Sequence, residues 1–461
     1  FLQSLTLDES VWFDHFFLPV ICPLFFVETL ADLSKRTRVG TRTPEDLVRI
    51  IADKTPVMSG APCVHHSQIC IANLMGHEAP HFGQVPLAGG RPVRGVDGKA
   101  GVVFKNSPEA EAFSRWQRGQ FQDIERESAS AWRAMLSDLN LPEVASRMRA
   151  LGITPQSCKT IEQAYGIAAS LVNTRFAPEQ QLGLLFSFVH IPQHLWGPII
   201  QRWSDAGFPS LAEFASYAAH VLKVEIFFQI ALAANLISSD RPSNRADIAY
   251  LFYLPFCHIF VSGDKLHRRC APAFLSKRQD FVWGPDLKAD ITRINQELSS
   301  IPEEERQIGL HKLAPQPPGD PGGVVASLWR KHAPNAQSSR EAPIPLSPEV
   351  ERKLVEHLKS FTKAPTAPDV ARLPQDNLEN IAIERLVPAN EGIAFPLGTM
   401  DTFTTYGGPA NLLETANTIG LPLYARQHLD EKGRWIDVMT EASILPVNKR
   451  PRLAIRLHTS N

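Results

Sequence analysis

Hydrophobic residues recur at helical spacing through much of the first half of the chain. Thr43-Pro44 is typical of a helix start, with threonine as N-cap and proline in the first turn. Ser107-Pro108 opens a second helix, which the pattern extends to about residue 139. Its expected buried stripe consists of Phe113, Trp116, Phe121, Ile124, Trp132 and Met135. With further helices expected over 142–151, 160–173, 178–188, 210–222 and 224–238, the pattern predicts one largely helical block over 40–235.

A different pattern flanks this block on both sides. Residues 18–26 predict a short buried strand or extended segment, followed by a helix over 27–33. Residues 247–254 predict a short apolar helix, and 258–262 form a buried-strand run that ends at Gly263-Asp264. Residues 280–300 show helical spacing again. These segments mix short strand-like and helical patterns, unlike the helical block between them.

The clearest linker lies over 313–346, where proline, glycine, serine and alanine are dense. Only 324–331 inside it is expected to be structured. A helix should follow over 347–361, and Leu453–Leu457 is strand-like near the end of the sequence. The pattern divides the chain into flanking segments over 1–39 and 236–300, the helical block over 40–235, the linker, and a C-terminal α+β region over 347–461.

Composition narrows the class of protein. A chain of 461 residues suggests two or three domains, and its 44% hydrophobic and 21% charged residues are ordinary for a globular protein. The net charge of −1 gives no global attraction to polyanions, so binding of nucleic acid would need local basic patches. The six cysteines are sparse and several have apolar neighbours, which indicates reduced, buried thiols and a cytoplasmic location. No apolar stretch predicts a membrane span.

Three acids stand out by their positions. Glu28 lies near the start of a helix after an apolar run, Asp247 lies on the short helix, and Asp264 ends the strand that follows it. Carboxylates at the ends of parallel strands face one crevice, where three of them repel one another unless a cation compensates. Hard oxygen ligands select Mg²⁺ or Mn²⁺, which can activate water and stabilise charge on a phosphodiester.

At these residues the sequence resembles the PIN-domain family of ribonucleases. The matching pieces are Pro23–Leu30 around Glu28, then Asp247, and then Phe260–Asp264 with its Ser262-x-Asp264 ending. The resemblance covers about 1–39 and 238–295. It implies a small parallel α/β fold, metal-dependent cleavage of RNA, and Glu28, Asp247 and Asp264 as catalytic residues and metal ligands.

The sequence departs from the family pattern in two ways. The first acid of the family is expected upstream of Phe1; alternatively Asp8 or Asp14 substitutes for it, or the site is degenerate. The second departure is the separation of Glu28 from Asp247, which is 247 − 28 = 219 residues. Because the cost of closing a loop rises slowly with its length, a large insertion accounts for that gap.

Basic residues flank the three acids in sequence. Lys35, Lys265, Arg268 and Arg269, with Ser262, are the expected contacts to an RNA substrate, although charged runs are more often solvated faces. The acids also have ordinary alternatives: Glu28 as an exposed or capping acid, Asp247 as an N-cap, and Asp264 as a turn residue.

A second group of metal-ligating residue types lies between positions 63 and 81. Its members are Cys63, His65, His66, Cys70, His77 and His81. The spacing matches no standard zinc motif, so the alternative is a histidine-rich loop over the cleft.

Two hypotheses follow. The first is an endoribonuclease that uses Mg²⁺ or Mn²⁺ at the three acids. The second is a catalytically degenerate PIN-like module that binds RNA or a protein partner. Neither involves a membrane.

Overall fold

The computed structural model describes most of the first 333 residues and short parts of the remainder. The described ranges are 1–35, 42–55, 61–77, 79, 81, 83, 85–86, 91–94, 100–103, 108–173, 178–306, 310–319, 322–333, 347–365, 427–429 and 435–437.

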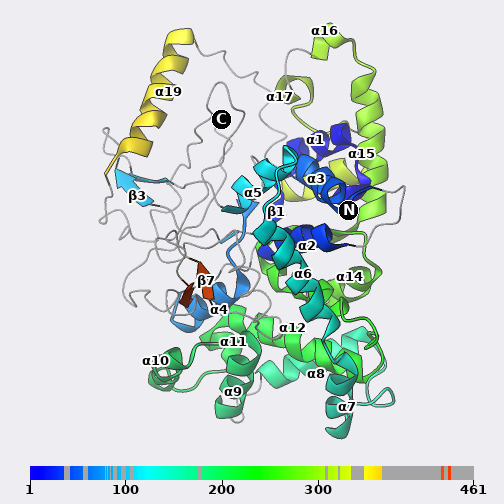
Figure 1. Cartoon of the computed structure of the whole chain (residues 1–461), viewed down its shortest axis with the longest axis vertical. Helices are drawn as coiled ribbons and strands as arrows, with labels where there is room; N and C mark the ends of the chain where they lie inside the picture. Colours follow the sequence, from blue (N-terminus) through cyan, green and yellow to red (C-terminus); the bar gives the residue numbers. More distant parts are fainter. Residues whose placement is uncertain are drawn as a thin grey trace.

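Helices hold most of these residues (Figure 1). In the first half they are η1 (Leu2–Ser4), α1 (Leu7–Phe16), α2 (Pro23–Ala31), η2 (Asp32–Ser34), α3 (Pro44–Lys54), α4 (His66–Leu74), α5 (Pro108–Gln117), α6 (Asp123–Ser137), α7 (Leu141–Ala150), α8 (Ile161–Asn173), α9 (Pro178–Val189), α10 (Gln193–Asp205), α11 (Leu211–Phe214) and α12 (Ser216–Ala233). In the second half they are α13 (Asn244–Ala249), η3 (Tyr250–Phe256), α14 (Lys265–Cys270), η4 (Ala271–Phe274), α15 (Gly284–Ser299), α16 (Glu303–Arg306), α17 (Leu310–Leu313), α18 (Val324–His332) and α19 (Pro348–Lys363).

The strands are short and pair only two by two within the described residues. Two pairs are parallel: β1 (Val20–Ile21) with β2 (Ala61–Pro62), and β5 (Ile259–Ser262) with β6 (Asp280–Trp283). Two are antiparallel: β3 (Arg91–Arg94) with β4 (Ala100–Val103), and β7 (Gln427–Leu429) with β8 (Trp435–Asp437).

The prediction of an α/β fold built on a PIN-like sheet is therefore wrong. A sheet that organises such a fold has several adjacent strands with helices on its faces. Here each parallel pair stands alone, and β1 and β5 belong to separate pairs. The apolar runs that predicted sheet strands are buried mainly by helices, so the described part of the chain is mostly helical.

The larger core forms around α12, which packs against α4, α7, α8, α9 and α11. Figure 1 shows α12 among these helices in the lower part of the molecule. Most residues of α12 are buried, including Tyr217, Phe227 and Ile230. A helix buried around most of its circumference is typical of a protein core. It is the one helix of the described residues long and apolar enough to cross a membrane, and its 78% burial is that of a core helix.

The start of α12 is held by a residue of another helix. The side-chain carbonyl of Asn73, on α4, accepts hydrogen bonds from the backbone N–H groups of Tyr217 (2.9 Å) and Ala218 (3.3 Å). The first N–H groups of a helix have no partner within it. Asn73 of α4 thus provides the N-cap hydrogen bonds that the alanine side chain at the N-cap position, Ala215, cannot provide.

A second core joins the first helix to elements near residue 330. α1, α15 and α18 bury Trp12, Phe16, Ile291 and Val325 against one another, and α1 lies beside α15 in Figure 1. The Trp329 indole N–H donates to the Phe16 carbonyl at 2.7 Å. The segment expected to be structured inside the linker is thus α18, and it packs into this core. The predicted domain boundaries stay predictions.

One expected helix is two in the structure. The pattern predicted a single helix from 107 to 139, but α5 ends at Gln117 and α6 begins at Asp123. Gly119 lies between them with φ +69°, a conformation that ends helices and favours glycine. The break also turns the predicted stripe: Trp116 and Trp132 are buried as expected, whereas Ile124 is 41% exposed.

Two proline positions explain other local differences. Pro23 occupies the first turn of α2, so the helix begins there and only Val20–Ile21 of the expected strand forms. Similarly, Gly284-Pro285 begins α15, and the apolar residues just before it form β6 instead of the predicted first helical turn.

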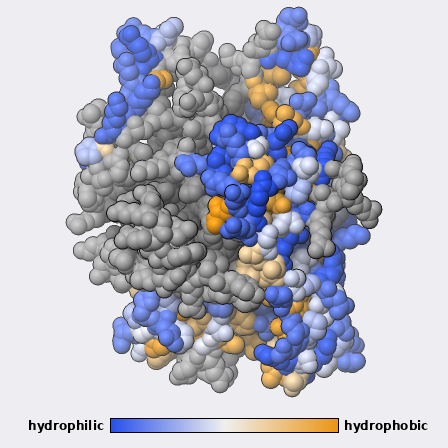
Figure 2. Space-filling view, in the orientation of Figure 1, coloured by the Kyte–Doolittle hydropathy of each residue, from blue (hydrophilic) through white to orange (hydrophobic). Residues whose placement is uncertain are grey.

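The described surface is mainly hydrophilic in the view of Figure 2, with smaller hydrophobic patches. Single exposed apolar side chains such as Leu151 (76% exposed) and Leu171 (52% exposed) are ordinary for a folded protein.

Candidate functional site

The structure brings the three predicted acids into one neighbourhood. Glu28 comes from α2, Asp247 from α13, and Asp264 from the turn between β5 and α14. Burial, and then the charge of Asp264 among others, raises the pKa of Glu28 to about 7. Burial raises the pKa of Asp247 to about 7 as well, with the charges of Glu28 and Asp264 adding to it. The three carboxyl groups thus interact electrostatically despite their distance in sequence.

Glu28 does not lie on a first helical turn as predicted. Because α2 begins at Pro23, Glu28 is in its second turn and half-buried. Its carboxylate accepts a hydrogen bond from the Tyr250 hydroxyl at 2.5 Å, which lowers the pKa of Glu28 and opposes the effect of burial. Sequence reasoning missed Tyr250. The available signal was its position three residues after Asp247, the spacing that puts two side chains on one helix face.

Asp264 is exposed and has a local structural role. Its side chain accepts from the Leu266 N–H at 2.6 Å and caps α14, a local role that differs from the turn residue expected as its ordinary alternative. Asp247 is not an N-cap: it is the fourth residue of α13, and Ser243 precedes the helix. One of the three acids therefore has a capping role, and two are half-buried within the cluster.

Ser262 belongs to a buried hydrogen-bond network beside the acids. The His267 ring donates from Nε2 to the Asp247 carbonyl at 2.6 Å, because a carbonyl can only accept. Burial lowers the pKa of His267, so the ring is neutral and its Nδ1 accepts from the Ser262 hydroxyl at 2.8 Å. The same hydroxyl accepts from the Asp264 N–H at 3.0 Å. This network ties β5, α13 and α14 together and engages the Ser262 hydroxyl in two hydrogen bonds within the protein.

The basic residues predicted to hold phosphates are exposed, and three of the four contact other parts of the protein. Arg268 lies over the Trp283 ring, with 4.9 Å from its guanidinium carbon to the ring centroid. Arg269 donates to the Leu236 carbonyl at 2.6 Å, and Lys35 pairs with Asp32 at 3.4 Å. Lys265 is exposed at the start of α14.

The cysteine and histidine group between positions 63 and 81 is largely a buried core feature. Cys63, His65, His66 and Cys70 are buried, and burial lowers the pKa of His65 to about 3. The rings of His65 and His66 lie 4.4 Å apart. Among the residues that the structure describes, no group of three or more His, Cys, Asp or Glu side chains is arranged to hold a metal ion.

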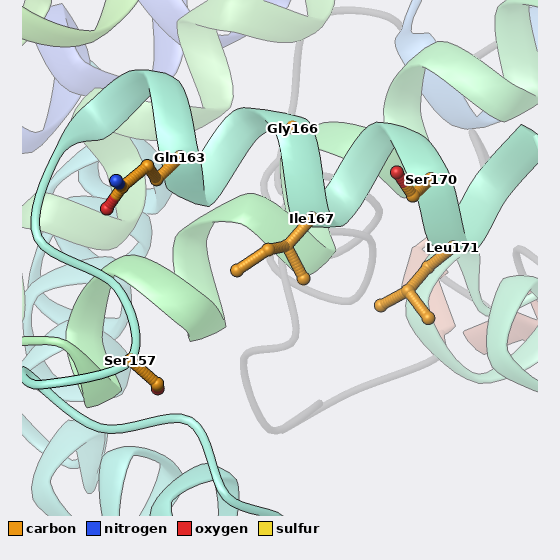
Figure 3. Close-up of a pocket in the computed structure, with 6 residues that line it drawn as sticks. All are labelled: Ser157, Gln163, Gly166, Ile167, Ser170 and Leu171. Atoms are coloured by element: carbon orange, nitrogen blue, oxygen red, sulfur yellow. The ribbon is translucent and has the colours of Figure 1, made fainter.

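A shallow groove on the outer face of α8 is the other surface feature. It is lined by Ser157, Gln163, Gly166, Ile167, Ser170 and Leu171, and Figure 3 shows all of them except Ser157 along one helix. Its side chains are apolar or uncharged, so the groove offers a packing surface without groups for acid–base or metal chemistry.

Comparison with known proteins points away from a nuclease. Residues 375–459 match the family model of phage major capsid protein E. A segment of the chain is 36% identical over 73 residues to the major capsid protein of Pseudomonas phage KPP10; this is 16% of the chain and 21% of that protein. The chain thus spans about a fifth of the relative that it matches. No solved structure gives a significant match.

These similarities overturn the prediction of a PIN-like ribonuclease and that of its degenerate, RNA-binding form. Hydrolase activity and catalytic use of a metal are wrong for the same reason. A bound Mg²⁺ or Mn²⁺ ion in itself stays a prediction that no observation tests. Within the matched range the structure describes the β7–β8 pair, in which Leu429 lies opposite Trp435. The strand-like Leu453–Leu457 lies outside the described residues.

Proposed function

We propose that this chain is a structural protein of a phage particle and that residues 375–459 bind other capsid subunits. The observation that carries the proposal is the match of this range to the phage major capsid protein E family. The identity of 36% over 73 residues with the major capsid protein of Pseudomonas phage KPP10 agrees with it. The partner is therefore a protein, including other copies of the same chain.

The layout of the chain supports a two-part arrangement. Residues 1–333 contain both hydrophobic cores. The end of the predicted linker, over 334–346, and the helix α19 separate them in sequence from the matched range. In this proposal the matched range contributes to the capsid shell, and the helical cores form a body attached to it.

The test is self-assembly of the full chain. The purified protein should sediment well above its 51.2 kDa monomer mass, and electron microscopy should show particles or regular oligomers. Ile455 lies in the strand-like run of the matched range. Ile455→Asp should shift the population to the monomer, because a charge within a predicted strand opposes its burial.

Leu151→Asp is the matched control, since Leu151 is 76% exposed at the end of α7 and far from the matched range in sequence. This variant should assemble like the wild type. A wild-type chain that stays monomeric at every concentration, or an Ile455→Asp variant that assembles normally, would overturn the proposal.

A further inference from the structure

Cys22 and Cys63 occupy opposite positions at the end of a parallel strand pair. Ile21 pairs with Pro62, and each cysteine is the next residue on its strand. The Cys63 N–H donates to the Ile21 carbonyl at 2.8 Å, which extends the ladder to this position. Cys22 keeps an extended backbone, with φ −87° and ψ 153°, before α2 begins. The register therefore places the two cysteines side by side.

This placement fits the geometry of a disulfide. Neighbouring strands lie about 4.8 Å apart, and disulfides join residues whose Cα atoms are about 4.4–6.8 Å apart. Residues in register on adjacent strands project to the same face of the pair. Both thiols are free in the structure, and each cysteine is only 6% exposed.

The two thiols also interact with each other. Burial raises the pKa of the Cys63 thiol, and the neighbouring Cys22 and Cys257 raise it further. Cys257 is held elsewhere, since its thiol donates to the Leu254 carbonyl at 3.5 Å. Of these three neighbours, Cys22 and Cys63 are the two that the strand register aligns.

We propose that Cys22 and Cys63 form a redox-sensitive pair, which closes to an intramolecular disulfide when the protein meets a small oxidising disulfide. The inference goes beyond the proposed function and does not depend on it. In a reducing cytosol the pair stays as two thiols, and in an oxidising medium it becomes a covalent link. That link joins the start of α2 to β2 across 63 − 22 = 41 residues.

The reaction is a thiol–disulfide exchange. Burial raises the pKa of the Cys22 thiol to about 12, and the N–H groups of Phe25 and Leu24 at the start of α2 oppose part of that rise. Cys22 attacks first, because at Cys63 the neighbouring thiols only add to the effect of burial. Its sulfur bonds to one sulfur of the small disulfide and releases the other as a thiol. Cys63 then attacks the Cys22 sulfur and releases the second small thiol. Two electrons pass from the protein to the small disulfide, which takes up the two protons as thiols. Burial of the pair makes the exchange slow at neutral pH.

The experiment incubates the full chain with oxidised glutathione, alkylates the unfolded product, and maps its disulfides by mass spectrometry. The six thiols should fall to four, with a Cys22–Cys63 peptide as the product. The oxidised protein should unfold at a higher temperature than the reduced one, because the link restricts the unfolded chain.

Two variants keep the result specific. Cys63→Ser should form no intramolecular disulfide and should lose at most one thiol, as a mixed disulfide of Cys22 with glutathione. Cys70→Ser, which removes another buried thiol, should still lose two thiols to the Cys22–Cys63 link. Retention of all six thiols in the wild type after prolonged oxidation would overturn the inference. A disulfide that joins Cys257 to either partner would overturn it as well.

Discussion

The ion pair between Glu225 of α12 and Arg245 of α13 provides the sharpest test of the folded structure. The two residues are 2% and 6% exposed, and their charged groups are in direct contact. Burial raises the pKa of Glu225, and the charge of Arg245 opposes that shift. Removal of one partner leaves a buried charge without compensation, which destabilises a protein by about 3–5 kcal/mol.

Glu225→Gln should therefore lower the free energy of unfolding by roughly 3–5 kcal/mol. The matched control is Glu143→Gln, which removes a carboxylate that pairs with Arg147 on the surface of α7. Those side chains are 50% and 77% exposed. Such exposed pairs contribute at most about 0.5 kcal/mol, so the control should change little.

Urea unfolding followed by circular dichroism gives both values, provided that the denaturant slope stays the same. The double variant Glu225→Met/Arg245→Met should recover most of the loss, since removal of both charges leaves neither unpaired. If Glu225→Gln and Glu143→Gln have equal effects, the pair is not buried in the way described.

Three further substitutions test the environment of one carboxyl group and the backbone at two glycines. Burial raises the pKa of Glu28 from its ordinary 4.5 to about 7, so the folded protein favours the protonated carboxyl group. The contribution of Glu28 to the free energy of unfolding is therefore fully present below pH 4.5 and is lost as the pH rises through 7. Glu28→Gln should then stabilise the protein by up to about 3 kcal/mol at pH 8 but not at pH 4. Thermal unfolding at both pH values measures this difference. A variant that unfolds at a lower temperature than the wild type at pH 8 would contradict the prediction. Gly119→Ala should cost about 1 kcal/mol because φ is +69° there and the added methyl meets no neighbour. Gly166→Ala, within α8, should instead stabilise by about 0.5–1 kcal/mol, and shifts of the same sign would refute the argument.

Helices with clear local signals could be predicted from the sequence. The Thr43-Pro44 start of α3 and the amphipathic pattern of α8 specify their elements because the deciding contacts lie within a few residues. The helix break at Gly119 was not predicted, because a glycine within a helical pattern can adopt either a helical or a positive φ angle and the sequence does not distinguish the two. The strand β6 was missed because its four residues are too few to show a period before α15 begins.

In the candidate site too, the position of the acids could be predicted better than their role. The proximity of Glu28 to Asp247 and Asp264 could be inferred from a family pattern, but their function could not, because the same acids also cap a helix and accept from Tyr250. The fold class failed for a related reason. Apolar runs of four to eight residues suit a buried strand and a buried helix equally well, and which one forms depends on the surrounding packing.

The second core joins residues that are far apart in the sequence and are therefore synthesised at different times. α1 contacts α3 early in the chain, but its partners in the second core, α15 and α18, follow close to 300 residues later. During translation the aromatic face of Trp12, Phe13 and Phe16 stays uncovered while the α12 core can already fold. Contacts between such distant segments form slowly, and uncovered apolar surface invites aggregation. A nascent chain stalled before α15 begins at Gly284 should therefore recruit chaperones at its first helix.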